Sequence, residues 1–180
     1  MKKLLSLLIT TLLISSCTSP IKVSAPGVVT SCNQIKLLES AYKSVLMGCL
    51  DGSSEINFHQ MKGPLLINVW GSWCEGCKQE MPYFVELYQN PLFKNGQIQM
   101  LGVNVEEKSK NDAIEYIQKS GMSWPNLEDS SGISKSIFGP GVPVTWFIDE
   151  NGKNIETKIG AYTNKMQLFN QVEKAFGVKL

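Results

Sequence analysis

The chain has 180 residues, of which 43% are apolar and 18% are charged, and its formal net charge is +1. This composition is ordinary for one globular domain and excludes a disordered or coiled-coil protein, and no basic patch stands out that could bind nucleic acid. A single histidine also excludes a zinc site built from several imidazoles.

The first sixteen residues are typical of a signal peptide. Two lysines precede an apolar run over residues 4–14, which is shorter than the roughly 20 residues that a membrane span needs. The run ends in Ser15-Ser16-Cys17, which resembles a bacterial lipobox. We therefore expect cleavage before Cys17, lipidation of that cysteine, and a location outside the cytoplasm. The alternative is ordinary cleavage near Ser16, with Cys17 incidental.

A tether is expected between this segment and the folded domain. Residues 17–43 are assigned to it, and their first part, up to about Ser31, is rich in Ser, Thr, Pro and Gly and lacks helical periodicity. The folded domain is assigned to residues 44–180.

Apolar spacing and turn residues predict the elements that follow. In chain order they are a short helix within 35–45, a β-hairpin of strands at 44–50 and 55–58, a central strand buried on both faces at 65–70, a helix from about residue 80, a strand at 97–105, a helix at 112–120 closed by Gly121, a strand at 144–148 with a hairpin turn at 150–153, and a helix at 165–176. This order predicts an α/β fold in which helices flank a central mixed sheet.

The chemistry is concentrated in Cys74-Glu75-Gly76-Cys77. The pair follows a buried strand and opens a helix, so Cys74 is expected at the helix start, where free N–H groups and the helix dipole stabilise a thiolate. A thiolate is the attacking species in disulfide exchange, and Cys77, one turn further on, is expected to resolve the mixed disulfide. Half of a four-cysteine zinc site is the alternative, but it lacks a second pair with this spacing.

These residues resemble the active-site stretch of the thioredoxin superfamily. The stretch 65–82 has its apolar strand, Trp73, the CxxC pair and the helix proline Pro82, while Val142-Pro143 resembles the cis-proline loop that faces the dithiol. Within the superfamily the chain is most similar to the TlpA/ResA/CcmG-like branch of extracytoplasmic proteins. The resemblance implies a thioredoxin fold with an N-terminal β-hairpin extension and a central helical insertion.

The resemblance also implies roles for single residues. Trp73, Val142 and Pro143 are expected to bind an extended substrate strand over Cys74. Glu75 is expected either to tune the dithiol by its charge or to be a solvated turn residue. Where thioredoxin has a buried aspartate, this chain has Asn68, and an amide cannot take up a proton.

Two further cysteines, Cys32 and Cys49, are expected to form a structural disulfide after export. Two reduced buried thiols or a second redox-active pair are the alternatives.

The leading hypothesis is a membrane-anchored thiol-disulfide oxidoreductase that reduces exported proteins, with apocytochrome c among the clients that the resemblance suggests. It implies a membrane electron donor of the DsbD or CcdA type, and no metal, cofactor or nucleic acid. A peroxiredoxin-like thiol peroxidase ranks lower because the chain contains no arginine to polarise a peroxide. A copper chaperone on the same fold ranks lower because such proteins use CxxxC and a distant histidine.

Overall fold

The computed structural model describes residues 25–180, so the signal peptide and Cys17 lie outside the described residues. Strand β3 (Leu65–Trp70) lies inside the sheet at the centre of the fold, and all six of its residues are buried. The other strands are β1 (Leu46–Cys49), β2 (Glu55–Asn57), β4 (Gln99–Val105), β5 (Asn126–Asp129), β6 (Val144–Ile148) and β7 (Asn154–Ile159). The α-helices are α1 (Glu75–Tyr88), α2 (Pro91–Lys94), α3 (Lys110–Ser120), α4 (Ser134–Phe138) and α5 (Lys165–Phe176), and two short 3-10 helices cover Cys32–Gln34 and Phe58–Gln60.

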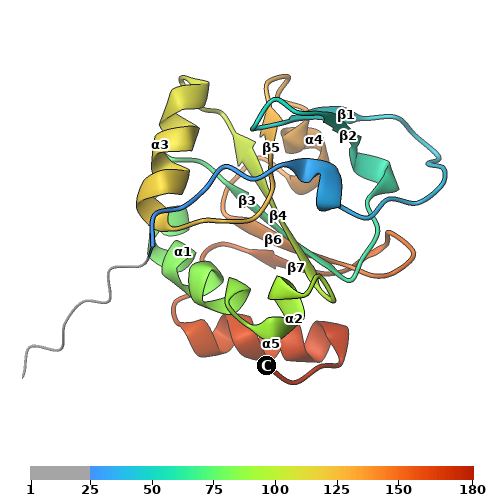
Figure 1. Cartoon of the computed structure of the whole chain (residues 1–180), viewed down its shortest axis with the longest axis vertical. Coiled ribbons are helices and arrows are strands. Elements are labelled where there is room, and N and C mark those ends of the chain that lie inside the picture. The colour runs from blue at the N-terminus through green and yellow to red at the C-terminus, as the bar shows by residue number, and fades with distance from the viewer. Residues whose placement is uncertain (1–24) are drawn as a thin grey trace, which may run out of the picture.

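One seven-stranded sheet has the order β2-β1-β5-β4-β3-β6-β7. Strands β3, β4 and β5 run parallel, while β6 pairs antiparallel with β3, and β1 pairs antiparallel with both β2 and β5. The predicted mixed sheet, its N-terminal hairpin and the helical insertion α3 between β4 and β5 are therefore confirmed (Figure 1).

The alternation of side chains along β3 separates two cores. Leu66 and Trp70 pack with α1, α3 and α5 on one face. Leu65, Ile67 and Val69 pack on the other face with α4 and the N-terminal hairpin. Figure 1 shows α1 and α5 side by side beneath the sheet, so the helix that begins at the CxxC pair packs against both the sheet and α5.

The prediction of a helix within residues 35–45 is wrong. This stretch has no helical turn; it runs along the domain with Leu37 bridged to Met61 and the N–H of Leu38 bonded to the carbonyl of Gln60. Tyr42, within this stretch, is 87% exposed. Residues of this stretch instead make separate contacts with residues 59–61, just after β2.

The described part of the expected tether, residues 25–43, also packs on the domain. Gly27 and Val28 donate backbone hydrogen bonds to the carbonyls of Gln118 and Met122, at 3.0 and 2.8 Å. A Cβ at Gly27 would lie 2.0 Å from the carbonyl oxygen of Ile117, so this close approach requires glycine. The packed chain thus extends upstream of residue 44. Within residues 25–180 no helix is long and apolar enough to cross a membrane.

Candidate active site

Cys74 and Cys77 form a disulfide at the start of α1, with their Cα atoms 5.3 Å apart. Cys74 is the N-cap of the helix, and its Sγ accepts a hydrogen bond from the N–H of Cys77 at 3.1 Å. The N–H group at the helix start therefore points at the sulfur that would carry a thiolate after reduction, as the sequence argument expects.

The pair is less exposed than the sequence argument expects. Cys74 is 5% exposed and Cys77 is fully buried. The difference follows from the fold, because the disulfide turns both sulfurs into the core formed by β3, α1 and α5. The accessible part of the pair still belongs to Cys74.

The Val142–Pro143 peptide bond is cis, as the resemblance implies. A Cβ on Gly76 would lie 3.4 Å from Cδ of Pro143 and 3.5 Å from Cβ of Ala161, so the proline loop packs directly against the CxxC turn. The carbonyl of Pro143 accepts a hydrogen bond from the N–H of Gly160 at 2.9 Å, which fixes the loop to the end of β7. A second cis proline, Pro64, was not expected from the sequence.

Trp73 is half exposed beside the disulfide. Its Nε1 donates to the carbonyl of Val105 at 3.3 Å, and its ring lies so close to Gly71 that a Cβ there would be 2.5 Å from Nε1. The indole forms one wall of a groove of about 450 Å³, with Tyr116 of α3 also in its lining. Burial raises the pKa of Tyr116 to about 12, so its hydroxyl stays protonated at neutral pH.

Glu75 points into solvent. Its side chain is 75% exposed, and it lies 3.9 Å from Nζ of Lys78. A pair this exposed interacts weakly because water screens the charges.

Glu80 is the residue that sequence reasoning missed. It lies three positions after Cys77 on the buried face of α1 and is fully buried. Its Oε1 accepts a hydrogen bond from Nδ2 of Asn68 at 3.0 Å, and its Oε2 accepts one from the N–H of Tyr162 at 2.9 Å. Burial, partly offset by these two bonds, raises the pKa of Glu80 to about 7. The available signal was a single acid within the apolar stripe formed by Cys77, Met81 and Phe84.

The site therefore contains a buried carboxyl group, although it does not come from the strand position where thioredoxin has aspartate. Asn68 occupies that position and binds the carboxyl group of the helix instead. Cys77 and Glu80 are three residues apart, so their side chains are neighbours on one face of α1, with Cβ atoms about 5–6 Å apart.

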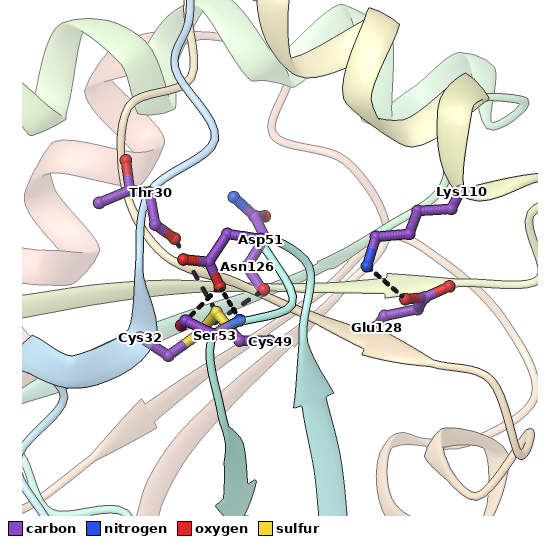
Figure 2. A network of polar contacts seen from close by, with 8 residues as sticks. All are labelled: Thr30, Cys32, Cys49, Asp51, Ser53, Lys110, Asn126 and Glu128. Carbon is purple, nitrogen blue, oxygen red and sulfur yellow. Dashed lines mark hydrogen bonds and ion pairs between the residues drawn. A yellow bond between two sulfur atoms is a disulfide. The ribbon is translucent and has the colours of Figure 1, made fainter.

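Cys32 and Cys49 form a second disulfide, with Cα atoms 6.0 Å apart. Figure 2 shows it among polar groups from the N-terminal segment, the turn after β1, and β5. The Sγ of Cys32 lies 3.7 Å from the carbonyl oxygen of Asn126, and the Sγ of Cys49 lies 3.9 Å from that of Thr30. The two disulfides belong to different cores on opposite faces of the sheet.

Comparison with known proteins shows to which family the chain belongs. The sequence model of the AhpC/TSA family matches residues 42–156, which is more than half of the chain and includes the CxxC pair and Pro143. The chain belongs to the AhpC/TSA family.

Similar proteins lie in the thioredoxin-like part of this family. The thiol-disulfide oxidoreductase ResA of Geobacillus thermodenitrificans is 33% identical over 102 residues, which cover 56% of this chain and 57% of that protein. ResA of Bacillus anthracis is 31% identical over 125 residues, 67% of this chain and 68% of that protein. The match to the Geobacillus protein thus spans little more than half of its length.

A solved structure agrees with the fold. The thioredoxin domain of a thiol-disulfide oxidoreductase from Bacteroides vulgatus superposes with a TM-score of 0.58 at 23% identity, over 75% of this chain and 94% of that one. The fold is therefore thioredoxin-like, and the recognition made from the CxxC and proline motifs is confirmed.

Proposed function

We propose that the protein is a thiol-disulfide oxidoreductase that reduces disulfides in exported proteins. The observation that supports this most is the Cys74–Cys77 disulfide at the start of α1, packed against the cis Pro143 loop. The names of the Geobacillus and Bacillus relatives support the same activity.

In the proposed reaction the reduced protein starts as a Cys74 thiolate and a Cys77 thiol. The Cys74 thiolate, stabilised by the helix start, attacks one sulfur of the client disulfide, and the other client sulfur leaves as a thiolate that takes a proton from water. Cys77 then gives its proton to the Glu80 carboxylate. The Cys77 thiolate attacks the Sγ of Cys74 and releases the second client sulfur as a thiolate, to which Glu80 returns the proton. Two electrons pass to the client, which gains two thiols, and the protein is left as the Cys74–Cys77 disulfide.

The burial of Glu80 suits this proton transfer. A carboxyl group whose pKa is raised to about 7 is partly ionised at neutral pH, so it can both accept a proton from a thiol and return it. Glu80 has no charged partner at hydrogen-bond distance among the described residues. We therefore assign proton acceptance to Glu80 and give Glu75 no step.

Client capture tests the activity. In Cys77→Ser the first attack still takes place but nothing ejects the client, so covalent complexes through Cys74 should accumulate and should disappear on reduction. Non-reducing gels and mass spectrometry of cells that express this variant measure them, and would show whether apocytochrome c is among the clients. Cys74→Ser is the matched control and should trap none. Complexes formed through Cys77 instead would contradict the assignment of the attacking thiol.

The direction of electron flow is tested by measuring the reduction potential of the Cys74–Cys77 pair. A reductant should have a Cys74–Cys77 reduction potential near that of thioredoxin, about −270 mV, whereas a potential near that of DsbA, about −120 mV, would indicate an oxidant and contradict the proposed direction. A reductant must be re-reduced after each turnover, and we propose a membrane donor of the DsbD or CcdA type.

We also propose that the protein works at the outer face of the cytoplasmic membrane, held by a lipid on Cys17. Stable anchoring needs about two acyl chains, and a diacylglyceryl cysteine carries two. Replacing Cys17 with serine should therefore move the protein from the membrane to the soluble or secreted fraction, as measured by fractionation and immunoblotting. Thr18→Ser is a control that should remain in the membrane fraction. A Cys17→Ser protein that also stays there would contradict the lipid anchor.

A further inference from the structure

The side chain of Asn68 has an unused hydrogen-bonding atom inside the core. The residue is fully buried on β3, and its Nδ2 donates to Oε1 of Glu80. Its Oδ1 has no hydrogen-bond partner among the described residues. A buried acceptor without a partner is costly, so it calls for an explanation.

The surroundings of Glu80 decide where a proton on its carboxyl group would sit. Oε2 faces the backbone N–H of Tyr162, at 2.9 Å, and an N–H can only donate. A proton on Oε2 would therefore place two donors face to face. The O–H of neutral Glu80 must consequently be on Oε1, which is the oxygen that faces Asn68.

An amide, unlike a carboxylate or a hydrocarbon, can pair with both forms of this group. With Glu80 charged, the NH₂ of Asn68 donates to Oε1. With Glu80 neutral, a half-turn of the amide about Cβ–Cγ brings the carbonyl oxygen to the same place, where it accepts the O–H. The turn breaks no other bond because Oδ1 has no partner. Either orientation leaves one amide atom unpaired, so the protonation of Glu80 decides between them.

We propose that Asn68 is the positioning residue for Glu80, donating to its carboxylate and turning to accept from its protonated form. The inference deepens the proposed function, on which it rests, since it assigns Asn68 to the step in which Cys77 gives up its proton. Asn68 itself touches neither client nor sulfur in this step and acts through Glu80.

The other ionisable groups around Glu80 do not take over the response of the Asn68 amide to the protonation of Glu80. They are Cys77 on α1, Tyr116 on α3, Lys158 on β7 and Tyr162 in the loop that follows. In the disulfide form Cys77 does not titrate. Burial raises the pKa of both tyrosines well above the neutral range. The ammonium of Lys158 donates to the carbonyls of Ile159 and Gly160, each at 2.8 Å, and makes no bond to Glu80.

The first test follows the amide itself in the oxidised protein. The side-chain ¹⁵N–¹H signals of Asn68 are recorded by NMR between pH 5 and 9, together with the carboxyl ¹³C signal of Glu80. We expect both sets of signals to shift with one midpoint, and the amide shift to vanish in Glu80→Gln. An amide that stays unchanged while Glu80 titrates, or a Glu80 that does not titrate in this range, would overturn the inference. This readout does not depend on any client reaction, so it separates failure of the inference from failure of the proposed function.

The second test follows the resolving step, measured as release of a nitrothiobenzoate group bound to Cys74. In Asn68→Leu the charged form of Glu80 loses the stronger, charge-assisted bond, so its pKa rises. The release rate at pH 7 should fall roughly tenfold and recover at higher pH. Unchanged rates in Glu80→Gln would refute Glu80 as proton acceptor. Slowed release in Glu80→Gln combined with an unchanged pH profile in Asn68→Leu would refute only the role of Asn68.

Asn104→Leu is the matched control. Asn104 is also buried, on the neighbouring strand β4, and its Nδ2 donates to Oε1 of Glu107 at 2.8 Å. Its replacement removes the same kind of hydrogen bond from the same sheet but leaves Glu80 untouched. The midpoint of the pH profile should therefore stay where it is in the unmodified protein. A shift as large as that in Asn68→Leu would indicate a general loosening of the sheet and would overturn the inference.

Discussion

At the scale of single residues, α1 carries both the cysteine pair that the sequence reveals and the buried carboxyl group that it does not. Cys74 and Cys77 are visible because their spacing is characteristic. Glu80 is not, because charged residues are mostly exposed, and its place within the apolar stripe of α1 was the sole local sign that this one is buried. Its two bonds come from Asn68 and from Tyr162, which lies 82 positions downstream, and only the fold brings these partners together.

The raised pKa of Glu80 predicts how stability depends on pH. Between the ordinary value of 4.5 and about 7, the folded protein keeps a proton that the unfolded chain has lost. The free energy of unfolding therefore falls as pH rises through this window and levels off above it, by about 3 kcal/mol in all from this group. Glu80→Gln cannot titrate at this position. Its free energy of unfolding, measured by urea denaturation between pH 4 and 8, should therefore lack this fall. Glu75→Gln, at an exposed position, is the control and should keep it; parallel curves for wild type and Glu80→Gln would contradict the burial effect.

At the scale of elements, the long strands and helices and the β1–β2 hairpin were predictable, whereas the short helices α2 and α4 were not. Residues 65–70 and 165–176 carry a strong pattern over their whole length, and the structure has β3 and α5 at these bounds. The four-residue α2 and five-residue α4 are too short to show a period, and α4 has no side-chain cap. The false helix at 35–45 failed because its apolar residues make tertiary contacts that local spacing does not encode.

The parallel strands leave no room for a side chain at Gly102 in β4. Trp70 of β3 donates from Nε1 to Oδ1 of Asn126 on β5, at 2.9 Å, and this bond passes over Gly102. A Cβ there would lie 1.7 Å from Oδ1 of Asn126 and 2.8 Å from Nε1 of Trp70. Only glycine at this position lets the indole behind the CxxC pair keep its partner.

Gly102→Ala should therefore lower the free energy of unfolding by about 2–4 kcal/mol, since it combines overpacking with a broken buried hydrogen bond. Urea denaturation measures the change. Gly48→Ala is the matched control: Gly48 is also a strand glycine, in β1, but a Cβ there meets nothing within 4 Å. We expect the control to change stability by less than about 1 kcal/mol. Equal losses in the two variants would mean that the Trp70–Asn126 contact does not limit this position.

At the scale of the whole molecule, the two disulfides have different surroundings on opposite faces of one sheet. Cys74–Cys77 closes a turn at a helix start, next to the half-exposed Trp73, and the proline loop packs against this turn. Cys32–Cys49 joins the N-terminal segment to β1 across 17 positions and is held between this segment and β5 (Figure 2). The cysteine positions alone allowed a structural bridge, free thiols or a redox relay. The separation of the two cores favours the structural bridge, because the sheet lies between the two pairs.

This arrangement predicts the order in which the two disulfides open. Exchange needs a thiolate that reaches a sulfur atom. Cys74 is 5% exposed at the start of α1, whereas Cys32 and Cys49 are 0% and 2% exposed in the core on the other face of the sheet. Closing a loop of this size stabilises the fold by roughly 3 kcal/mol in the chain-entropy model. Mild dithiothreitol should therefore open Cys74–Cys77 first and leave Cys32–Cys49 intact, as measured by differential alkylation and peptide mapping. Replacing both Cys32 and Cys49 with serine should lower the free energy of unfolding by about 3 kcal/mol and expose residues 25–43 to protease, while Cys74 stays reactive. Alkylation of all four cysteines at the same reductant concentration would refute the structural role of this bridge.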